Sequence, residues 1–186
     1  MAPSSISTKR GDDGTTGLLY GGRVRKDSAR IECNGAVDEA QAVLGLARGH
    51  LIGVGGEMDG TASLLLLLER ELWVLMAEVA TAPRNRRKLV AGTSLVTAEM
   101  VQAIEDRVHA LEESGAIPAE FVVPGGDVPS AALDLARTVV RRAERLAVRA
   151  AIADGSQVVP YLNRLSDLLW LLARSVERHH VTARGT

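Results

Sequence analysis

Three arginines and one glutamate in the segment 130–153 have the types and spacing needed to bind a polyphosphate. Arg137, Arg141 and Arg145 recur every four residues, so on an α-helix they share one face with Glu144. Neighbouring arginines repel one another, and a single glutamate cannot balance three of them. Guanidinium groups match phosphate oxygens in geometry and stay charged at physiological pH. The pattern therefore favours an anionic ligand, although a surface stripe of arginines screened by salt is also common.

A second stretch with binding chemistry is TKRGDDGTTG, residues 8–17. Its glycines allow backbone amides to approach a ligand closely, and its lysine, arginine and threonine side chains suit phosphate. The stretch lacks the GxxxxGK[ST] order of a P-loop, and no apolar strand precedes it. Taken alone, it is most simply a flexible polar arm at the N-terminus.

A third candidate is a polar stripe within the otherwise apolar segment 158–179. At about 100° per residue, Asn163, Asp167 and Arg174 fall on one side of a helix, opposite a row of leucines. Unpaired polar groups are costly to bury, so the stripe needs either partners inside the protein or a wet cleft. A buried network that fixes helix register and a binding site explain the stripe equally well.

The composition is that of one folded domain with a sizeable core. The chain has 186 residues, 46% of them hydrophobic, and its net charge of −1 gives no electrostatic footprint for nucleic acid. The single Cys33 excludes an internal disulfide and fits a reducing compartment. We expect a cytoplasmic protein, because no stretch suits a membrane span and the N-terminus has no apolar secretion signal. The spacing of the four histidines suggests no zinc site.

Helices must position these candidate residues, because apolar residues recur at helical spacing in five segments separated by Gly- or Pro-marked breaks. The five predicted helices are 31–48, 59–81, 94–114, 130–153 and 158–179. Their lengths and short connections predict an all-α, up-and-down five-helix bundle over residues 31–180, with no convincing sheet. We expect a glycine-rich arm over residues 1–30 and a frayed tail over residues 181–186. The basic run 84–88 is most simply a solvated loop.

Five motifs occur along the chain in a fixed order. They are TKRGDDGTTGLLYGGRVRKD at the N-terminus, GAVDE at 35–39, EFVVPGG at 120–126, VRRAER at 140–145 and YLNRLSDLLWLLAR at 161–174. Together they resemble the motifs of the PduO-type ATP:corrinoid adenosyltransferases. The resemblance implies a homotrimer of five-helix bundles that binds ATP, Mg²⁺ and reduced cobalamin between neighbouring subunits. The implied reaction is attack of cobalt(I) in cob(I)alamin on the 5′-carbon of ATP, which gives adenosylcobalamin and triphosphate.

The resemblance also implies roles for individual residues. Glu144 would lie beside the nucleotide and its metal ion, and Asp38 would pair with Arg145 of a neighbouring subunit. Arg142 lies in the same motif, but on a helical wheel it falls off the arginine face, so we expect it to be peripheral. The residues expected to matter for catalysis are Asp38, Arg141, Glu144 and Arg145. The expected ATP-binding residues are Thr8, Lys9, Arg10, Gly11, Thr16, Gly17, Lys26, Arg141, Arg142, Glu144, Arg145 and Asn163. The arm at residues 1–30 would thus become ordered around ATP.

Phe121, the only phenylalanine in the chain, is the expected corrinoid-binding residue. By itself, an isolated aromatic residue before a Pro-Gly-Gly turn is most simply a packing residue. In the family that the chain resembles, a phenylalanine at the FxxPGG position lies beneath the corrin. There its ring excludes the lower axial ligand of cobalt(II), which brings cobalt(I) within reach of a biological reductant.

The chain departs from the family pattern in the first helix, where DEAQA at 38–42 replaces the more usual DELNS. Contacts between subunits are expected to differ there. Besides ATP, cob(I)alamin and two further copies of the chain, the expected partners are a cobalamin reductase and an adenosylcobalamin-dependent mutase that receives the product. Two alternatives stand beside the enzyme, namely an escort protein for adenosylcobalamin and a non-catalytic helical bundle. The second leaves the glycine-rich arm and the arginines without a cause.

Overall fold

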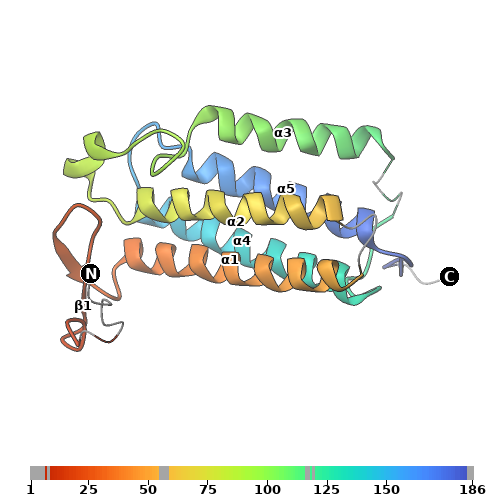
Figure 1. Ribbon diagram of the computed structural model, residues 1–186, viewed down its shortest axis with the longest axis horizontal. Coiled ribbons are helices and arrows are strands. Elements are labelled where there is room, and N and C mark those ends of the chain that lie inside the picture. The colour runs from red at the N-terminus through yellow and green to blue at the C-terminus, as the bar shows by residue number, and fades with distance from the viewer. Residues whose placement is uncertain (1–6, 8, 55–58, 116–117, 119, 184–186) are drawn as a thin grey trace.

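Five long helices make up most of the protein in this computed structural model (Figure 1). The structure describes residues 7, 9–54, 59–115, 118 and 120–183. The long helices are α1 (Ala29–Val54), α2 (Asp59–Val79), α3 (Ala98–Glu113), α4 (Val128–Ala150) and α5 (Val158–Val176). The shorter elements are the strands β1 (Thr15–Gly17) and β2 (Arg23–Arg25) and the 3-10 helix η2 (Pro83–Lys88). The prediction of a mainly helical protein with five main helices is confirmed.

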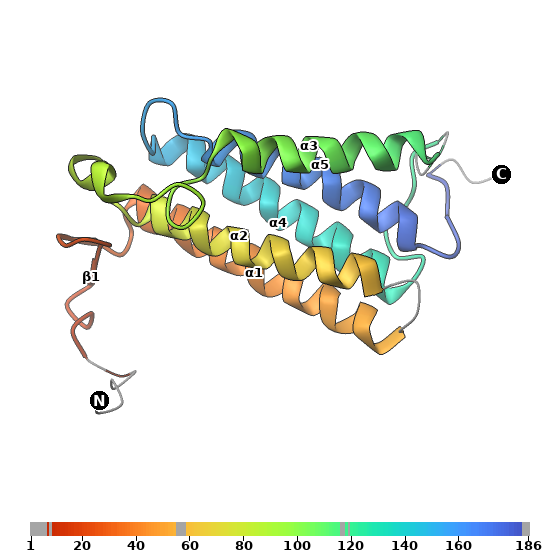
Figure 2. The same cartoon turned by 45° about the horizontal axis from the view of Figure 1, so that its top comes forward.

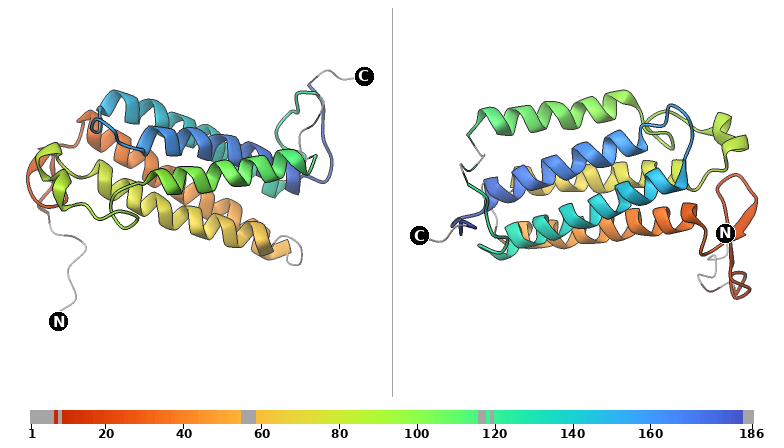
Figure 3. Two further views of the ribbon diagram at one scale, coloured as in Figure 1. Left: turned by 90° about the horizontal axis from the view of Figure 1, so that it is seen from above. Right: turned by 180° about the vertical axis from the view of Figure 1, so that it is seen from behind.

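The helices pack as neighbours in the order α2, α1, α4, α5, α3 (Figures 1 and 2). Aliphatic side chains from their facing sides form the core, and Tyr161 of α5 is its largest fully buried member. Burial of this apolar surface is the main force that holds the bundle together. Seen from behind, α1, α4 and α5 lie side by side in front of α2 (Figure 3). Within the described part of the chain, no helix combines the length and apolarity needed to cross a membrane.

The limits of α1 and α3 differ from the predicted ones. α1 runs from Ala29 to Val54, past the predicted end at residue 48, because the glycines beyond that point do not stop the helix. α3 begins at Ala98 rather than at residue 94. Its cap is Thr97, whose hydroxyl accepts a hydrogen bond from the Met100 backbone N–H at 3.3 Å.

The limits of α4 and α5 are also set by local chemistry. α4 begins before residue 130, because Asp127 and Ser130 form a reciprocal capping box. It ends where Ala151 adopts left-handed backbone geometry with φ 45°. α5 ends at Val176, before the predicted end at residue 179, because Glu177 leaves helical geometry.

The N-terminal arm contains a β-hairpin, which the sequence analysis did not predict. β1 and β2 pair antiparallel, with Thr15 opposite Arg25. The turn between them has positive φ at Tyr20 (62°), Gly21 (97°) and Gly22 (100°). Strands of three residues are too short to show a recognisable alternation, so no strand pattern was visible in the sequence.

The hairpin turn is attached to the end of the bundle (Figure 1). The Leu19 backbone N–H donates to the Ala80 carbonyl at 2.9 Å, and Asn85 Nδ2 donates to the Tyr20 carbonyl at 3.3 Å. Lys88 Nζ lies 5.7 Å from the centre of the Tyr20 ring. The basic run 84–88 is therefore a short helical segment in contact with the hairpin rather than a loop, but none of its residues is buried, so it is solvated as expected.

The end of the chain returns to the segment before α4. The Val123 N–H donates to the Val181 carbonyl at 2.7 Å, and the Ala183 N–H donates to the Phe121 carbonyl at 2.8 Å. These bonds flank an isolated antiparallel bridge between Val122 and Thr182. Residues 181–183 thus differ from the frayed tail that we expected, and residues 184–186 lie outside the described residues.

Candidate active site

The arginine-rich face of α4 points out of the bundle. Arg141 and Arg145 are exposed, and Arg145 Nη1 donates to the Arg141 backbone carbonyl at 3.0 Å. Arg142 forms an ion pair with Glu39, which places it toward α1. Leu135, an apolar residue of the same helix, is 50% exposed. Arg137 is half-buried beside Asp134, so of the three predicted arginines only Arg141 and Arg145 are open to a ligand.

Polar side chains of α4, α5 and α3 form a half-buried network beside this face. Asn163 Nδ2 donates to Glu144 Oε1 at 3.0 Å, and Asn163 Oδ1 accepts from Arg164 Nη1 at 2.7 Å. Arg164 Nε donates to Glu105 Oε1 at 2.7 Å. Chemistry fixes the orientation of the Asn163 amide, since a guanidinium group only donates and a carboxylate only accepts. We name these four residues the Asn163 network.

Sequence reasoning found half of the Asn163 network. It identified Glu144 and Asn163 through the motifs that contain them. Arg164 lies in the same motif, next to Asn163, and could have been found there. Nothing in the sequence marks Glu105, because it comes from α3 and meets the network only in the folded protein.

A second carboxylate, Asp167, lies at the same place. Burial raises its pKa; the nearby Arg164 and Arg141 lower it, and Glu144 raises it further. Asp167 is therefore close enough to both Arg141 and Glu144 to feel their charges. The surface between α4 and α5 thus combines an exposed arginine with two carboxylates and an amide.

Arg174 lies in a separate, buried cluster. Its Nη2 donates to Asp134 Oδ2 at 2.6 Å, and its Nε lies 3.2 Å from Glu177 Oε2. These three side chains are at most 5% exposed. The predicted stripe therefore divides into two parts, because Arg174 belongs to a buried network that fixes packing while Asn163 and Asp167 lie at a half-exposed surface.

Lys26, which follows β2, lies against the glycines of the loop before β1. The Lys26 backbone N–H donates to the Gly14 carbonyl at 2.9 Å, which folds the end of β2 back onto this loop. A Cβ added to Gly11 would lie 2.9 Å from Lys26 Nζ, so the absence of a side chain lets the ammonium group approach the backbone. A cation beside glycine backbone is suited to an anionic group.

Arg23 holds the same loop from the other strand. Its Nη2 donates to Thr15 Oγ1 at 2.6 Å and to the Arg10 carbonyl at 2.5 Å. Of the other predicted ATP-binding residues in the arm, Lys9 and Gly17 are exposed and Thr16 is half-buried in β1. Thr8 lies outside the described residues. The arm therefore has a folded framework with its lysines open to solvent.

Within one chain, residues 9–26 of the arm do not meet the Asn163 network. The hairpin bonds to Ala80 and Asn85 at the end of α2 and in η2. No hydrogen bond or ion pair joins residues 9–26 to the Asn163 network. Asp38 and Arg145 are both exposed, and no ion pair joins them within the described chain. The predicted site is thus divided, in one chain, into the N-terminal arm and the surface of α4 and α5.

Phe121 is 86% exposed, so its ring does not pack in the core. It begins the segment 121–126, which we name the Phe121 loop. Gly126 ends this loop and packs closely against the chain near His179. A Cβ at this position would lie 2.3 Å from the His179 carbonyl oxygen, so only glycine fits without movement. The Gly126 N–H donates to Glu177 Oε1 at 3.2 Å. The backbone of the loop is held in place, while the aromatic side chain is left open.

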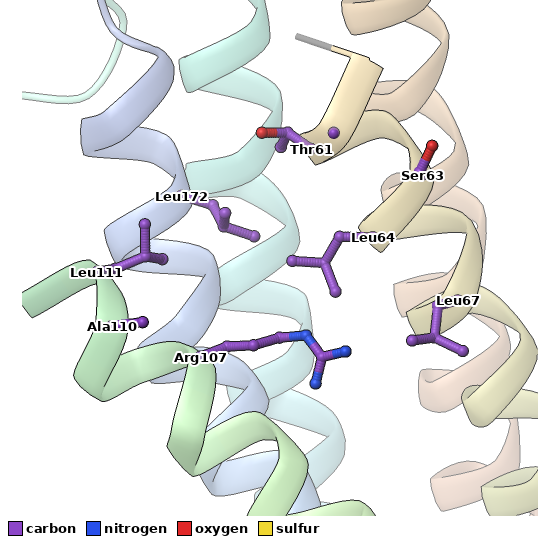
Figure 4. Close-up of a pocket in the computed structure, with 9 residues that line it drawn as sticks. Thr61, Ser63, Leu64, Leu67, Arg107, Ala110, Leu111 and Leu172 are labelled. Carbon is purple, nitrogen blue, oxygen red and sulfur yellow. The ribbon is translucent and has the colours of Figure 1, made fainter. Parts of the chain in front are cut away.

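A groove of about 500 Å³ lies between α2, α3 and α5 (Figure 4). Its lining is mostly apolar, and the Arg107 side chain extends into it. The lining residues are Gly60, Thr61, Ser63, Leu64, Leu67, Arg107, Ala110, Leu111 and Leu172. Because none of these is a predicted site residue, the groove is distinct from the candidate active site.

Comparison with known proteins identifies the family. A family model described as cobalamin adenosyltransferase matches residues 6–176. The chain belongs to the cobalamin adenosyltransferase family. It is 39% identical over 174 residues to the corrinoid adenosyltransferase of Bacillus subtilis (strain 168), covering 92% of this chain and 86% of the relative. It is 38% identical over 179 residues to the cobalamin adenosyltransferase of Cupriavidus metallidurans, covering 94% and 89%.

Solved structures of this family have the same fold. A phenylalanine-to-histidine variant of the PduO-type ATP:corrinoid adenosyltransferase from Lactobacillus reuteri, complexed with cobalamin and ATP, superposes with a TM-score of 0.82. The match covers 97% of each chain at 24% sequence identity. An arginine-to-lysine variant of that enzyme complexed with ATP gives a TM-score of 0.81 at 23% identity. At these identities, the likeness establishes the fold.

Proposed function

We propose that the protein transfers the 5′-deoxyadenosyl group of ATP to the cobalt of cob(I)alamin, giving adenosylcobalamin and triphosphate. The family membership makes it a corrinoid adenosyltransferase. The observation that carries the detailed reaction is the outward arginine face of α4 beside the Asn163 network. A triphosphate leaving group needs cations that are free to receive it, and Arg141 and Arg145 are exposed there.

The reaction requires positioning and charge stabilisation rather than proton transfer. Cobalt(I) supplies the electron pair of the new Co–C bond, and the C5′–O bond breaks with its electron pair leaving on the triphosphate. Arg141 would stabilise the charge that the leaving oxygen gains. Asn163, held by Glu144 and Arg164, would orient the nucleoside. This division of roles explains why no histidine or serine is needed as a catalyst.

A Mg²⁺ ion fits the site if ATP supplies most of its ligands. Among the residues that the structure describes, no group of three His, Cys, Asp or Glu side chains could hold a metal ion. Mg²⁺ commonly takes one or two carboxylates together with substrate phosphates. Glu144 would supply a carboxylate, and Asp167 is a second one nearby. When bound, the ion would neutralise part of the triphosphate charge.

We infer that a neighbouring subunit in a homotrimer completes the site. The separation of the arm from the Asn163 network within one chain supports this, because the arm of another copy could cover the arginine face of α4. Asp38 and Arg145 are exposed and available for a pair between subunits. Arg137 is a further candidate partner, since its buried Nε has no hydrogen-bond partner within the described chain, although it lies 3.5 Å from Asp134 Oδ1.

Phe121 is proposed to cover the lower face of the corrin. Its exposed ring supports this role, because an aromatic side chain in contact with water has no packing function of its own in the subunit. By excluding an axial ligand from cobalt(II), the ring would ease reduction to the nucleophilic cobalt(I) state. The cobalamin reductase, the mutase that receives the product and the cytoplasmic location stay predictions.

The test of the proposed function is anaerobic incubation of the protein with reduced cobalamin, ATP and Mg²⁺. We expect adenosylcobalamin and free triphosphate in equal amounts. If a folded sample forms neither, the protein is not an adenosyltransferase. Tight retention of added adenosylcobalamin without any turnover would instead support the escort protein.

A further inference from the structure

We propose that the C-terminal segment, residues 177–183, is a strap that positions the Phe121 loop for corrinoid binding. This proposal rests on the proposed function of Phe121. The family model matches the chain only to residue 176, so the strap follows the matched region. The assignment comes from the contacts that the strap makes in this structure.

Backbone pairing joins the strap to the loop. Val123 donates to the Val181 carbonyl at 2.7 Å, and Ala183 donates to the Phe121 carbonyl at 2.8 Å. The second bond is made by the backbone of Phe121 itself. It therefore fixes the residue that carries the exposed ring, and it leaves that ring free for a ligand.

The Glu177 side chain anchors the base of the strap. This carboxylate is fully buried, and its Oε1 accepts from the Gly126 N–H at 3.2 Å and from Ser130 Oγ at 3.4 Å. Its Oε2 lies 2.8 Å from His180 Nδ1 and 3.2 Å from Arg174 Nε. One side chain thus ties the end of the loop, the start of α4 and the strap together. A buried carboxylate with a cation beside it and several hydrogen-bond donors is a stable anchor, because losing Arg174 would leave its charge uncompensated and losing a donor would weaken its stabilisation.

Two further contacts hold the loop against the strap. The Arg178 backbone N–H donates to Asp127 Oδ2 at 3.1 Å, next to the end of the loop. The Gly126 backbone lies against the His179 carbonyl so closely that no larger residue fits without movement. The strap therefore sets both the hydrogen bonds and the shape of the loop.

The loop needs such support because its own side chains contribute little packing. Phe121 is 86% exposed and Val123 is 44% exposed, so apolar contacts do not hold the start of the loop. An unpaired loop would sample many conformations, and corrinoid binding would then have to order it. Pairing with the strap provides this order before the ligand arrives.

The experiment compares the full chain with two truncated chains, one ending at His180 and a control ending at Ala183. The chain ending at His180 lacks the acceptor of Val123 and the donor to Phe121. In ligand-free protein, we expect hydrogen exchange of the Val123 amide to be about tenfold faster in this chain and unchanged in the control. With ATP and cob(II)alamin, we expect less four-coordinate cobalt. With an added one-electron reductant such as a reduced flavin, turnover from cob(II)alamin should fall about tenfold, while turnover from chemically pre-reduced cob(I)alamin should change less than about threefold.

Two point variants keep the test valid if truncation affects folding. Ala183→Pro removes the donor to the Phe121 carbonyl, whereas Ala183→Val retains it at the same exposed position. Only the proline variant should show less four-coordinate cobalt in bound cob(II)alamin and faster hydrogen exchange of the Val123 amide. Unchanged exchange and cobalt spectra in both the truncated and the proline chains would overturn the strap. Absence of four-coordinate cobalt in the full chain would instead overturn the proposed role of Phe121.

Discussion

Arg141 is the side chain on which turnover should depend most. It lies on the exposed face of α4, so Arg141→Ala removes no core contact and should leave the melting temperature unchanged. Loss of a cation that contacts the leaving phosphate should cost about 2–4 kcal/mol in the transition state. Steady-state turnover and thermal unfolding measure the two effects. Arg141→Lys is the control that keeps the charge but loses the planar fork. Near-normal turnover of the alanine variant would remove Arg141 from the mechanism.

Phe121 gives a second prediction at this scale. A buried phenylalanine replaced by alanine costs roughly 3–5 kcal/mol of stability, but the exposed ring should cost far less. Phe121→Ala should therefore unfold like the wild type, yet bind cob(II)alamin with a fifth ligand on the cobalt. Electron paramagnetic resonance with ATP present distinguishes five-coordinate from four-coordinate cobalt. Identical spectra together with a large loss of stability would show that the ring only packs.

The Asn163 network links α3, α4 and α5 at the level of elements. Without Arg164, the Asn163 amide can rotate, so Arg164→Ala should weaken ATP binding and lower kcat together by about tenfold. Glu105→Gln should have a smaller effect, because its amide oxygen can still accept from Arg164. Kinetics with varied ATP measure both changes. Wild-type kinetics of Arg164→Ala would show that the orientation of Asn163 does not depend on α3.

The start of α4 gives a prediction about pH. Partial burial raises the pKa of Asp127. Hydrogen bonds from the backbone N–H groups of Ser130 and Arg178 outweigh this effect and lower the pKa below the usual 3.8. A lowered pKa in the folded state stabilises the protein above the unfolded pKa, and this stabilisation is lost as pH falls through the folded value. Between about pH 5 and pH 2, the free energy of unfolding measured with urea should therefore fall less steeply with decreasing pH in Asp127→Asn than in the wild type. An unchanged pH profile would contradict this assignment.

The elements that the sequence predicted are those with a long apolar period. Helical spacing located five helices but not their exact ends. The start of α3 is set by its cap, Thr97, and several residues before it look equally suitable as a cap in the sequence. The hairpin stayed hidden because its strands have three residues each. A helical wheel gives the direction of a side chain but not its depth. It therefore grouped Arg174 with Asn163, although only Arg174 is buried.

Assembly of the whole molecule provides the last prediction. If Asp38 and Arg145 pair between subunits, each single substitution leaves an unmatched charge in an interface, and turnover should fall in both. The charge-swapped double variant, Asp38→Arg with Arg145→Asp, should recover part of the trimer or of the turnover. Sedimentation and turnover measure the outcome. If Arg137→Ala lowers trimer formation and turnover but Arg145→Ala does not, the partner of Asp38 is Arg137. Wild-type assembly in all single variants would exclude the pair.

The packing of α1 against α4 has a consequence for how the chain is made. These two helices form the most extensive contact in the described bundle, yet α2, η2 and α3 separate them in sequence. During synthesis, α1 and α2 can pair as soon as both have left the ribosome, but the side of α1 that α4 covers must wait. Closing so long a loop is slower than local pairing. The nascent chain therefore carries an uncovered apolar surface on α1 until α4 emerges.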